Sequence, residues 1–289
     1  MTRSLTRQTV GRTRNGRRFI RQRLPRRLRR VPTPLAQLVV VVLFFIAWET
    51  LSGDPQKTAT PLDEFFVGKP SGIWRNLMNW FQDGQLLSAT WVTLQEAIIG
   101  FVIGSAWGVS WGFALGASRI LASVFAPMLY LVYAVPRLAL VPMFILWFGL
   151  GLESKIAMVS VLVFFLTFFN SYAGAQQVDG ELIAVTRMMG ASRWQVLLKV
   201  TLPSAVAWVS VGLQMSVPHA FTGAIVAEIV AGNKGLGHLI THSANLFNAN
   251  GVFAGILVAV VIALGINSLV AYGTRYLLRW RTTDATAAT

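Results

Sequence analysis

A few ionisable and amide side chains interrupt the apolar stretches of this sequence, and they are the first candidates for chemistry. Glu96, Gln214, His219 and Glu228 all lie within runs of apolar residues. A charge in an apolar membrane span is costly, so such residues are candidates for a pathway or a gate. Gln214 and His219 could donate hydrogen bonds to an anionic solute. Glu228 would repel an anion, so a structural or gating contact, for example with Lys234, suits it better. For each residue taken alone, holding helices together is the simpler interpretation.

The remaining inventory argues against an enzyme. The chain has no cysteine, which excludes disulfides, thiolate metal sites and cysteine nucleophiles. It has only three histidines, and neither a clustered catalytic pair nor a set of metal ligands stands out. It also lacks the G-x-x-x-x-G-K-[ST] phosphate loop, so it is not expected to bind ATP itself. We therefore expect no catalytic residue, no cofactor and no metal.

A second kind of chemistry, docking to a partner, is indicated by residues 181–203, ELIAVTRMMGASRWQVLLKVTLP. Gly190 is placed to end a first short helix. Ser192 and Gln195 have the S-x-x-Q spacing of a capping box that would start a second helix. Pro203 fits the first turn of the membrane span that follows. A helix, a glycine turn and a second helix would present a compact knob for the cleft of a partner protein, although an ordinary loop has the same outline.

The elements that must position these residues are membrane spans. The chain has 289 residues, of which 54% are hydrophobic and 12% charged, with a mean hydropathy of +0.58. A soluble domain is usually about a quarter charged. The net charge of +14 comes mainly from the first 30 residues, which hold 12 arginines and no acid. Because this tail (residues 1–34) precedes an apolar segment, contact with lipid headgroups is the better interpretation, and nucleic-acid binding is the alternative.

Six spans satisfy the distribution of basic residues, because an even number places both termini in the cytoplasm. Residues 121–150 then hold one crossing, preceded by a helix low in the membrane, with breaks at Pro136 and Pro142. Between the first two spans lies an external loop at 52–88, and the segment 176–203 is cytoplasmic, as is the tail 281–289. In the second span glycine recurs every four positions from Gly100 to Gly116, where another helix can pack closely. The expected spans are 35–51, 90–117, 138–151, 155–175, 204–229 and 251–274.

The spacing within 181–203 resembles the signature of the membrane subunits of ATP-binding-cassette (ABC) importers. That signature is Glu-Ala-Ala, three residues, Gly, nine residues and Ile-x-Leu-Pro. Here Ala184, Val185 and Thr186 occupy the first positions, Gly190 follows, and Val200-Thr201-Leu202-Pro203 ends the motif. The acid that opens the signature is absent, and Glu181 stands one turn earlier. The residues that the resemblance assigns to an ATPase-coupling loop are Glu181, Ala184, Val185, Thr186, Gly190, Ala191, Ser192, Leu202 and Pro203.

The resemblance extends from about Leu87 to Trp280. PRLALVPMFILWFGLG at 136–151, MMGASRWQVLLKVTLP at 188–203 and VAEIVAGNKGLGHLI at 226–240 look like the nitrate, sulfonate, taurine and bicarbonate branch of importer permeases. It implies an all-α polytopic fold of the MetI-like kind, with a permease domain at 89–280, in the bacterial inner membrane. It also implies a homodimer, two cytoplasmic ATPase subunits and an external substrate-binding protein.

The cargo that this branch implies is a small oxyanion or alkanesulfonate, such as nitrate, a sulfonate or taurine. A vitamin or vitamin precursor is the alternative cargo. A stand-alone secondary transporter or channel is the alternative function, and it would need a relay of charges across several spans. The few ionisable groups within the spans argue against that alternative.

Overall fold

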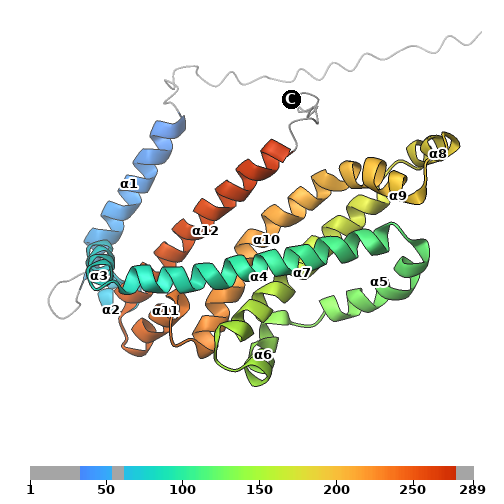
Figure 1. The fold of residues 1–289 in the computed structure, drawn as a ribbon. Helices are drawn as coiled ribbons and strands as arrows, with labels where there is room; N and C mark the ends of the chain where they lie inside the picture. The colour runs from blue at the N-terminus through green and yellow to red at the C-terminus, as the bar shows by residue number, and fades with distance from the viewer. Residues whose placement is uncertain (1–32, 54–61, 278–289) are drawn as a thin grey trace, which may run out of the picture. The chain divides into compact units, whose positions relative to one another are not determined.

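The computed structural model describes residues 33–53 and 62–277, and these are almost entirely helical (Figure 1). Two short strands, β1 (Ser52–Gly53) and β2 (Leu62–Asp63), pair in parallel. The expected tails at 1–34 and 281–289 lie outside the described residues, apart from the first two positions of α1. The helices are α1 (Thr33–Leu51), α2 (Glu64–Val67), α3 (Pro70–Gln82), α4 (Gln85–Gly116), α5 (Arg119–Tyr133), a 3-10 turn η1 (Arg137–Leu140), α6 (Val141–Phe148), α7 (Leu152–Gln176), α8 (Gly180–Met188), α9 (Arg193–Val196), a π-helical turn η2 (Leu197–Thr201), α10 (Leu202–Ala231), α11 (Leu236–Asn245) and α12 (Ala249–Leu277).

The long helices match the expected spans in most places. In the described part of the chain, four helices are long and apolar enough to cross a membrane, namely α4, α7, the continuous run Arg193–Ala231 and α12. A bent pair formed by α5 and the segment 137–148 counts as a fifth if it is one span. The shorter apolar helix Ala36–Leu51 lies within α1. The six expected spans thus correspond to four long helices, one bent pair and one shorter helix.

The prediction of a single membrane-crossing helix at 138–151 was wrong, because the helix there is too short and follows a sharp bend. Only eight residues of it form α6, which is about 12 Å of helix at 1.5 Å per residue, against the ~30 Å of a bilayer core. The axes of the pair differ by 81°. Pro136 lies in the break, and Pro142 stands in the first turn of α6. Helix α6 is therefore too short to cross by itself, and this segment could form one broken span only together with α5.

The glycine stripe of α4 makes the expected close contact with another helix, and the structure shows that this helix is α7. A Cβ atom added at Gly112 would lie 2.6 Å from the carbonyl oxygen of Phe168, and one added at Gly100 would lie 2.5 Å from side-chain carbons of Val159. Only glycine allows the two backbones to approach so closely. Helices α4, α7 and α10 form the centre of the fold, with a buried apolar cluster of Ala97, Val159, Val163, Ala220, Phe221 and Ala224.

The segment expected as an external loop, 52–88, is largely helical in the part that the structure describes, residues 62–88. It contains the amphipathic helix α3, whose Ile73 and Leu77 pack on Ala254 of α12. The Lys69 amide, next to the start of α3, donates a 2.6 Å hydrogen bond to Asn250 Oδ1. These contacts fix α3 against the beginning of α12.

Candidate functional site

The segment 180–203 has the helix–turn–helix form expected from its sequence. Asp179 accepts a 2.8 Å hydrogen bond from the Glu181 amide and so caps α8. Gly190 has a φ of +84°, a conformation that side chains with a Cβ rarely adopt. The capping box is complete, because the Gln195 amide donates to Ser192 Oγ at 3.3 Å and the Ser192 amide donates to Gln195 Oε1 at 2.8 Å. We call residues 180–203 the knob.

The junction of the knob with α10 differs from the expectation in one respect. Leu202 and Pro203 open α10, but the helix does not begin there, since Arg193–Ala231 forms one run of 39 residues. The π turn η2 joins α9 to α10. Pro203 has no amide hydrogen for the ladder, and a wider turn before it keeps the helix continuous. A rotation of α9 would therefore be transmitted directly to α10.

The knob exposes large apolar side chains. Met188 is 80% exposed, Met189 83% and Trp194 69%, and Leu182, Val185 and Leu198 are exposed as well. Ala184 and Glu181 are exposed, whereas Thr186 and Ala191 are half-buried. The Thr186 hydroxyl donates to the Leu182 carbonyl oxygen at 2.7 Å. Large apolar side chains exposed on a connecting segment make it a candidate for contact with a protein partner.

Behind the knob lies a hollow of about 340 Å³. Its walls come from the end of α7, the start of α8 and the first turns of α10, and include Gln177, Asp179, Leu182, Pro203, Ser204 and Trp208. The hollow leaves room for α8 to move relative to the span that follows it. No sequence signal indicated this space.

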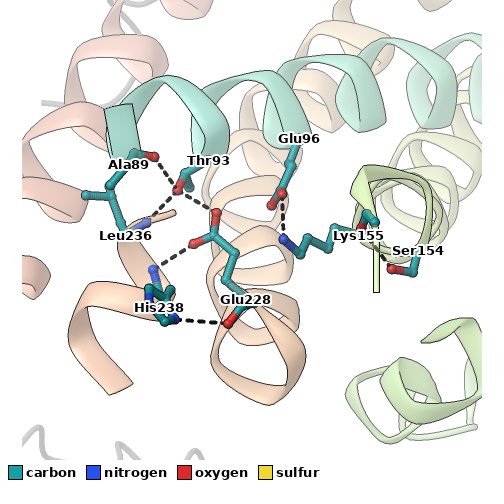
Figure 2. A network of polar contacts seen from close by, with 11 residues as sticks. Ala89, Thr93, Glu96, Ser154, Lys155, Glu228, Leu236 and His238 are labelled. Atoms are coloured by element: carbon teal, nitrogen blue, oxygen red, sulfur yellow. Dashed lines mark hydrogen bonds and ion pairs between the residues drawn. The ribbon is translucent and has the colours of Figure 1, made fainter. Parts of the chain in front are cut away.

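A second group of polar residues is buried between α4, α7 and α10 (Figure 2). Lys155 Nζ lies 3.0 Å from Glu96 Oε1, and their side chains are 6% and 0% exposed. The ion pair joins α7 to α4. Paired charges are the form in which ionisable groups are tolerated away from water.

Glu228 of α10 belongs to the same group of buried polar residues. Its Oε1 accepts a 2.6 Å hydrogen bond from the Thr93 hydroxyl, and its Oε2 accepts one of 2.6 Å from the Gly237 amide. Thr93 Oγ1 in turn accepts a 2.9 Å hydrogen bond from the Leu236 amide. The first amides of a helix have no partner within the helix, so Thr93 and Glu228 together cap α11 (Figure 2).

The pairing of Glu228 with Lys234 was wrong. The carboxylate turns inward to the start of α11, where Gly235 leaves space for it: a Cβ added there would overlap the carboxylate. Lys234 instead lines an open hollow of about 360 Å³ with Asp83, Asn233 and His238.

The other pathway candidates do not join this group. Gln214 Nε2 donates to Thr274 Oγ1 at 2.6 Å and so ties α10 to α12. His219 is exposed, and its Nδ1 lies 2.9 Å from the Met215 carbonyl oxygen. Gln214 and Glu228 are about 21 Å apart along α10 at 1.5 Å per residue. The structure therefore does not unite Gln214, His219 and Glu228 into one site.

Sequence reasoning missed Thr93 and Lys155. Thr93 stands three residues before Glu96, which places both on one face of α4. Lys155 lies inside the first turn of an expected span, where a lysine is readily taken for a boundary residue. Its presence within the apolar run was the available signal.

Comparison with known proteins gives one consistent result. Residues 100–281 match the family described as binding-protein-dependent transport system inner membrane component. A Bacillus subtilis (strain 168) permease protein named for aliphatic sulfonates transport, SsuC, is 30% identical over 244 residues, which cover 84% of this chain and 87% of the relative. The riboflavin transport system permease protein RibX of Chloroflexus aurantiacus is 32% identical over 243 residues, covering 84% and 88%. The taurine transport system permease protein TauC of Escherichia coli (strain K12) is 29% identical over 193 residues, covering 65% and 70%.

The fold has a solved counterpart in the MetNI methionine ABC transporter. An inward-facing structure of that transporter superposes with a TM-score of 0.56 at 19% identity, covering 65% of this chain and 92% of that chain. The superposition confirms the expected all-α, MetI-like fold.

Proposed function

Because this chain belongs to the binding-protein-dependent transport system inner membrane components, the permease subunits of ABC importers, we propose that its knob couples the membrane spans to a separate ATPase. A permease subunit is not itself an enzyme, so the energy for transport must come from a partner protein. The chain is a multi-pass membrane protein. We place it in the bacterial inner membrane with both termini in the cytoplasm.

The exposure of the apolar side chains on the knob is the observation that carries this proposal. Met188, Met189 and Trp194 extend from a helix–turn–helix in which a side chain caps the N-terminus of each helix. A capped unit is already ordered, so docking would cost little further ordering. Methionine adapts well to the contours of a groove. In this proposal the coupling loop comprises the residues that the family signature indicates, namely Glu181, Ala184, Val185, Thr186, Gly190, Ala191, Ser192, Leu202 and Pro203.

The absence of the acid that opens the family signature is compatible with an apolar contact surface on the knob. The position it would occupy is Ala184, which lies on the exposed surface of α8. Glu181, one turn earlier, is also exposed and stands in the first turn of the helix. A carboxylate at that place favours the helix dipole. We infer that Glu181 supports α8 itself and that the contact with the ATPase is mainly apolar.

The complete transporter would contain further subunits. We propose two copies of this chain, two ATPase subunits, an external substrate-binding protein and the surrounding lipids, with no nucleic acid. The two copies would form the pathway between them. ATP-driven closure of the ATPase subunits would move both knobs, and the continuous helix from Arg193 to Ala231 would carry the motion into the membrane.

For the cargo, we propose a small oxyanion or alkanesulfonate such as nitrate, a sulfonate or taurine. The similarity to the relatives named for sulfonates and taurine supports this class. A vitamin or vitamin precursor is the second candidate, because the relative named for riboflavin is equally similar. Uptake of labelled ethanesulfonate, taurine and riboflavin by cells with the complete transporter distinguishes the two classes.

The docking proposal is tested by charging the knob. Met188→Glu combined with Met189→Glu should abolish co-purification of the ATPase and ATP-dependent uptake, because desolvating two carboxylates in an apolar groove is unfavourable. Gln176→Glu, at the exposed end of α7, adds a charge outside the knob and outside the hollow behind it, and is the control. Both variants should reach the membrane at wild-type levels. An ATPase that stays bound to the double variant would refute the docking surface.

A further inference from the structure

Arg137, a cation between two apolar helices, has no acidic partner among the residues that the structure describes. Arg137 stands at the break between α5 and α6 and is half-buried. Its guanidinium carbon lies 5.8 Å from the ring centroid of Phe165, which is near the middle of α7. Phe165 is separated from the two ends of α7 by about 20 Å and about 16 Å of helix rise at 1.5 Å per residue. The guanidinium therefore lies far from the level of the lipid headgroups.

The Arg137 guanidinium packs on aromatic rings of α5 and α7. Its guanidinium carbon is 4.3 Å from the ring centroid of Tyr133. Tyr133 packs edge-on against Phe169, with 5.0 Å between ring centroids, and against the buried Phe165 at 5.8 Å. Attraction to ring faces holds the cation while leaving the N–H donors along the edge of its plane uncommitted. The aromatic rings that hold the cation therefore come from both α5 and α7.

Lys155 and Arg137, two cations within the apolar segments, differ in their partners. Lys155 is neutralised by Glu96 at 3.0 Å. For Arg137, the residues described by the structure offer no carboxylate within 4.0 Å. A cation at membrane depth ordinarily pairs with an acid or lines a path for ions or substrate. The break at Pro136 also places it where backbone is tolerated only beside protein or water.

We infer that Arg137 binds the anionic head group of the cargo on its way through the membrane. Guanidinium presents parallel N–H donors that match two oxygens of a sulfonate or carboxylate. The aromatic rings fix the plane of the guanidinium group, so the anion approaches one edge of that plane. This role rests on the proposed function, and it explains how a permease would favour an oxyanion over a neutral solute. Phosphate from a lipid has the same chemistry, but the depth of Arg137 separates it from headgroups.

Transport by the complete importer tests the inference. Arg137→Gln should lower uptake of labelled ethanesulfonate at least tenfold, whereas Arg137→Lys, which keeps the charge without the paired donors, should be intermediate. ATP hydrolysis by the assembled transporter without cargo should stay within twofold of the wild type. Uptake by Arg137→Gln at the wild-type rate would overturn the role of Arg137 alone. A wild-type transporter that imports neither ethanesulfonate nor taurine nor nitrate would refute the proposed cargo class, and with it this role.

The absence of cysteine allows a second, direct test of position. Arg137→Cys should react with a charged methanethiosulfonate reagent from the water phase at least ten times faster than Leu131→Cys. Leu131 is 74% exposed on the apolar surface of α5 and serves as the matched position. Both single-cysteine chains are labelled within the assembled transporter. A reaction at Arg137→Cys no faster than at Leu131→Cys would overturn the inference, because the position would then not face a water-filled path.

Discussion

Lys155 and Glu96 form a buried ion pair that ties α7 to α4, with 3.0 Å between Nζ and Oε1. Thr93, one turn before Glu96, binds the carboxylate of Glu228, so α10 and the start of α11 join the same group. Four helices therefore meet at polar contacts in the part of the fold where apolar packing would otherwise let them slide. Such contacts specify which helix faces which, beyond the stability that they add.

Removal of one partner of this ion pair should be strongly destabilising. Lys155→Met leaves the Glu96 carboxylate buried without a counter-charge, which costs about 3–5 kcal/mol. The double variant Glu96→Gln with Lys155→Met should recover much of the loss, because no unpaired charge remains. Thermal unfolding in detergent, followed by tryptophan fluorescence, measures both.

The pair of Lys69 and Glu49 supplies the control. Its atoms are 3.5 Å apart and its side chains are 31% and 36% exposed. Exposed pairs contribute about 0–1 kcal/mol, so Glu49→Gln should have little effect on the unfolding temperature. Equal losses for Lys155→Met and Glu49→Gln would contradict the importance given to the buried pair.

The cap on α11 should govern the local stability of that helix. Glu228→Ala leaves the Gly237 amide without its acceptor, a loss of about 1–3 kcal/mol. Hydrogen exchange in α11 should then speed up, whereas exchange in α4 and α7 should change little. Thr222→Ala removes an exposed hydrogen bond from a hydroxyl group to a carbonyl oxygen within α10 itself, and is the control. Unaltered exchange in α11 of the Glu228→Ala variant would show that the cap is not needed.

Local signals predicted local structure well. The S-x-x-Q box at Ser192 and the break at Gly190 appear in the structure as expected, since each depends only on residues within one or two turns. The glycine repeat in α4 likewise predicted a close helix contact. Apolar runs predicted the long helices for the same reason, because length and composition are properties of the segment alone.

Contacts between distant segments could not be predicted in the same way. Nothing near Glu228 indicates Thr93, which lies 135 positions away in the chain. The nearer Lys234 was the obvious partner, but Gly235 admits the carboxylate to the start of α11 instead. The 81° bend after α5 was also missed, since proline marks where a helix breaks and not the angle at which it resumes.

The close contact of α4 with α7 should be intolerant of larger residues. Gly112→Leu would drive a side chain into the Phe168 carbonyl, where a Cβ alone already lies at 2.6 Å. We expect this variant to be degraded or to unfold at a much lower temperature. Gly265 of α12 has nothing within 4 Å of the equivalent Cβ position, so Gly265→Leu should insert and fold normally. Comparable membrane levels of the two variants would contradict the packing of the stripe.

Gly190 should be needed for its backbone conformation and not for space. Its φ is +84°, yet a Cβ added there meets nothing within 4 Å. A left-handed backbone costs about 1–2 kcal/mol for a residue with a side chain, less for asparagine. Gly190→Val should therefore distort the turn between α8 and α9, and ATP-dependent uptake should fall at least fivefold while ATP hydrolysis continues. Gly190→Asn should retain most of the uptake.

Gly84 makes the result interpretable, because it has the same properties elsewhere in the fold. Its φ is +71° and its added Cβ also meets nothing within 4 Å, but it lies between α3 and α4, away from the knob. Gly84→Val introduces similar strain and should leave the ratio of uptake to ATP hydrolysis unchanged. If Gly84→Val and Gly190→Val lower that ratio equally, the loss reflects general strain and the coupling role of the knob is refuted. A selective loss for Gly190→Val ties transport to the angle at which α8 meets α9, and so to the surface that would contact the ATPase.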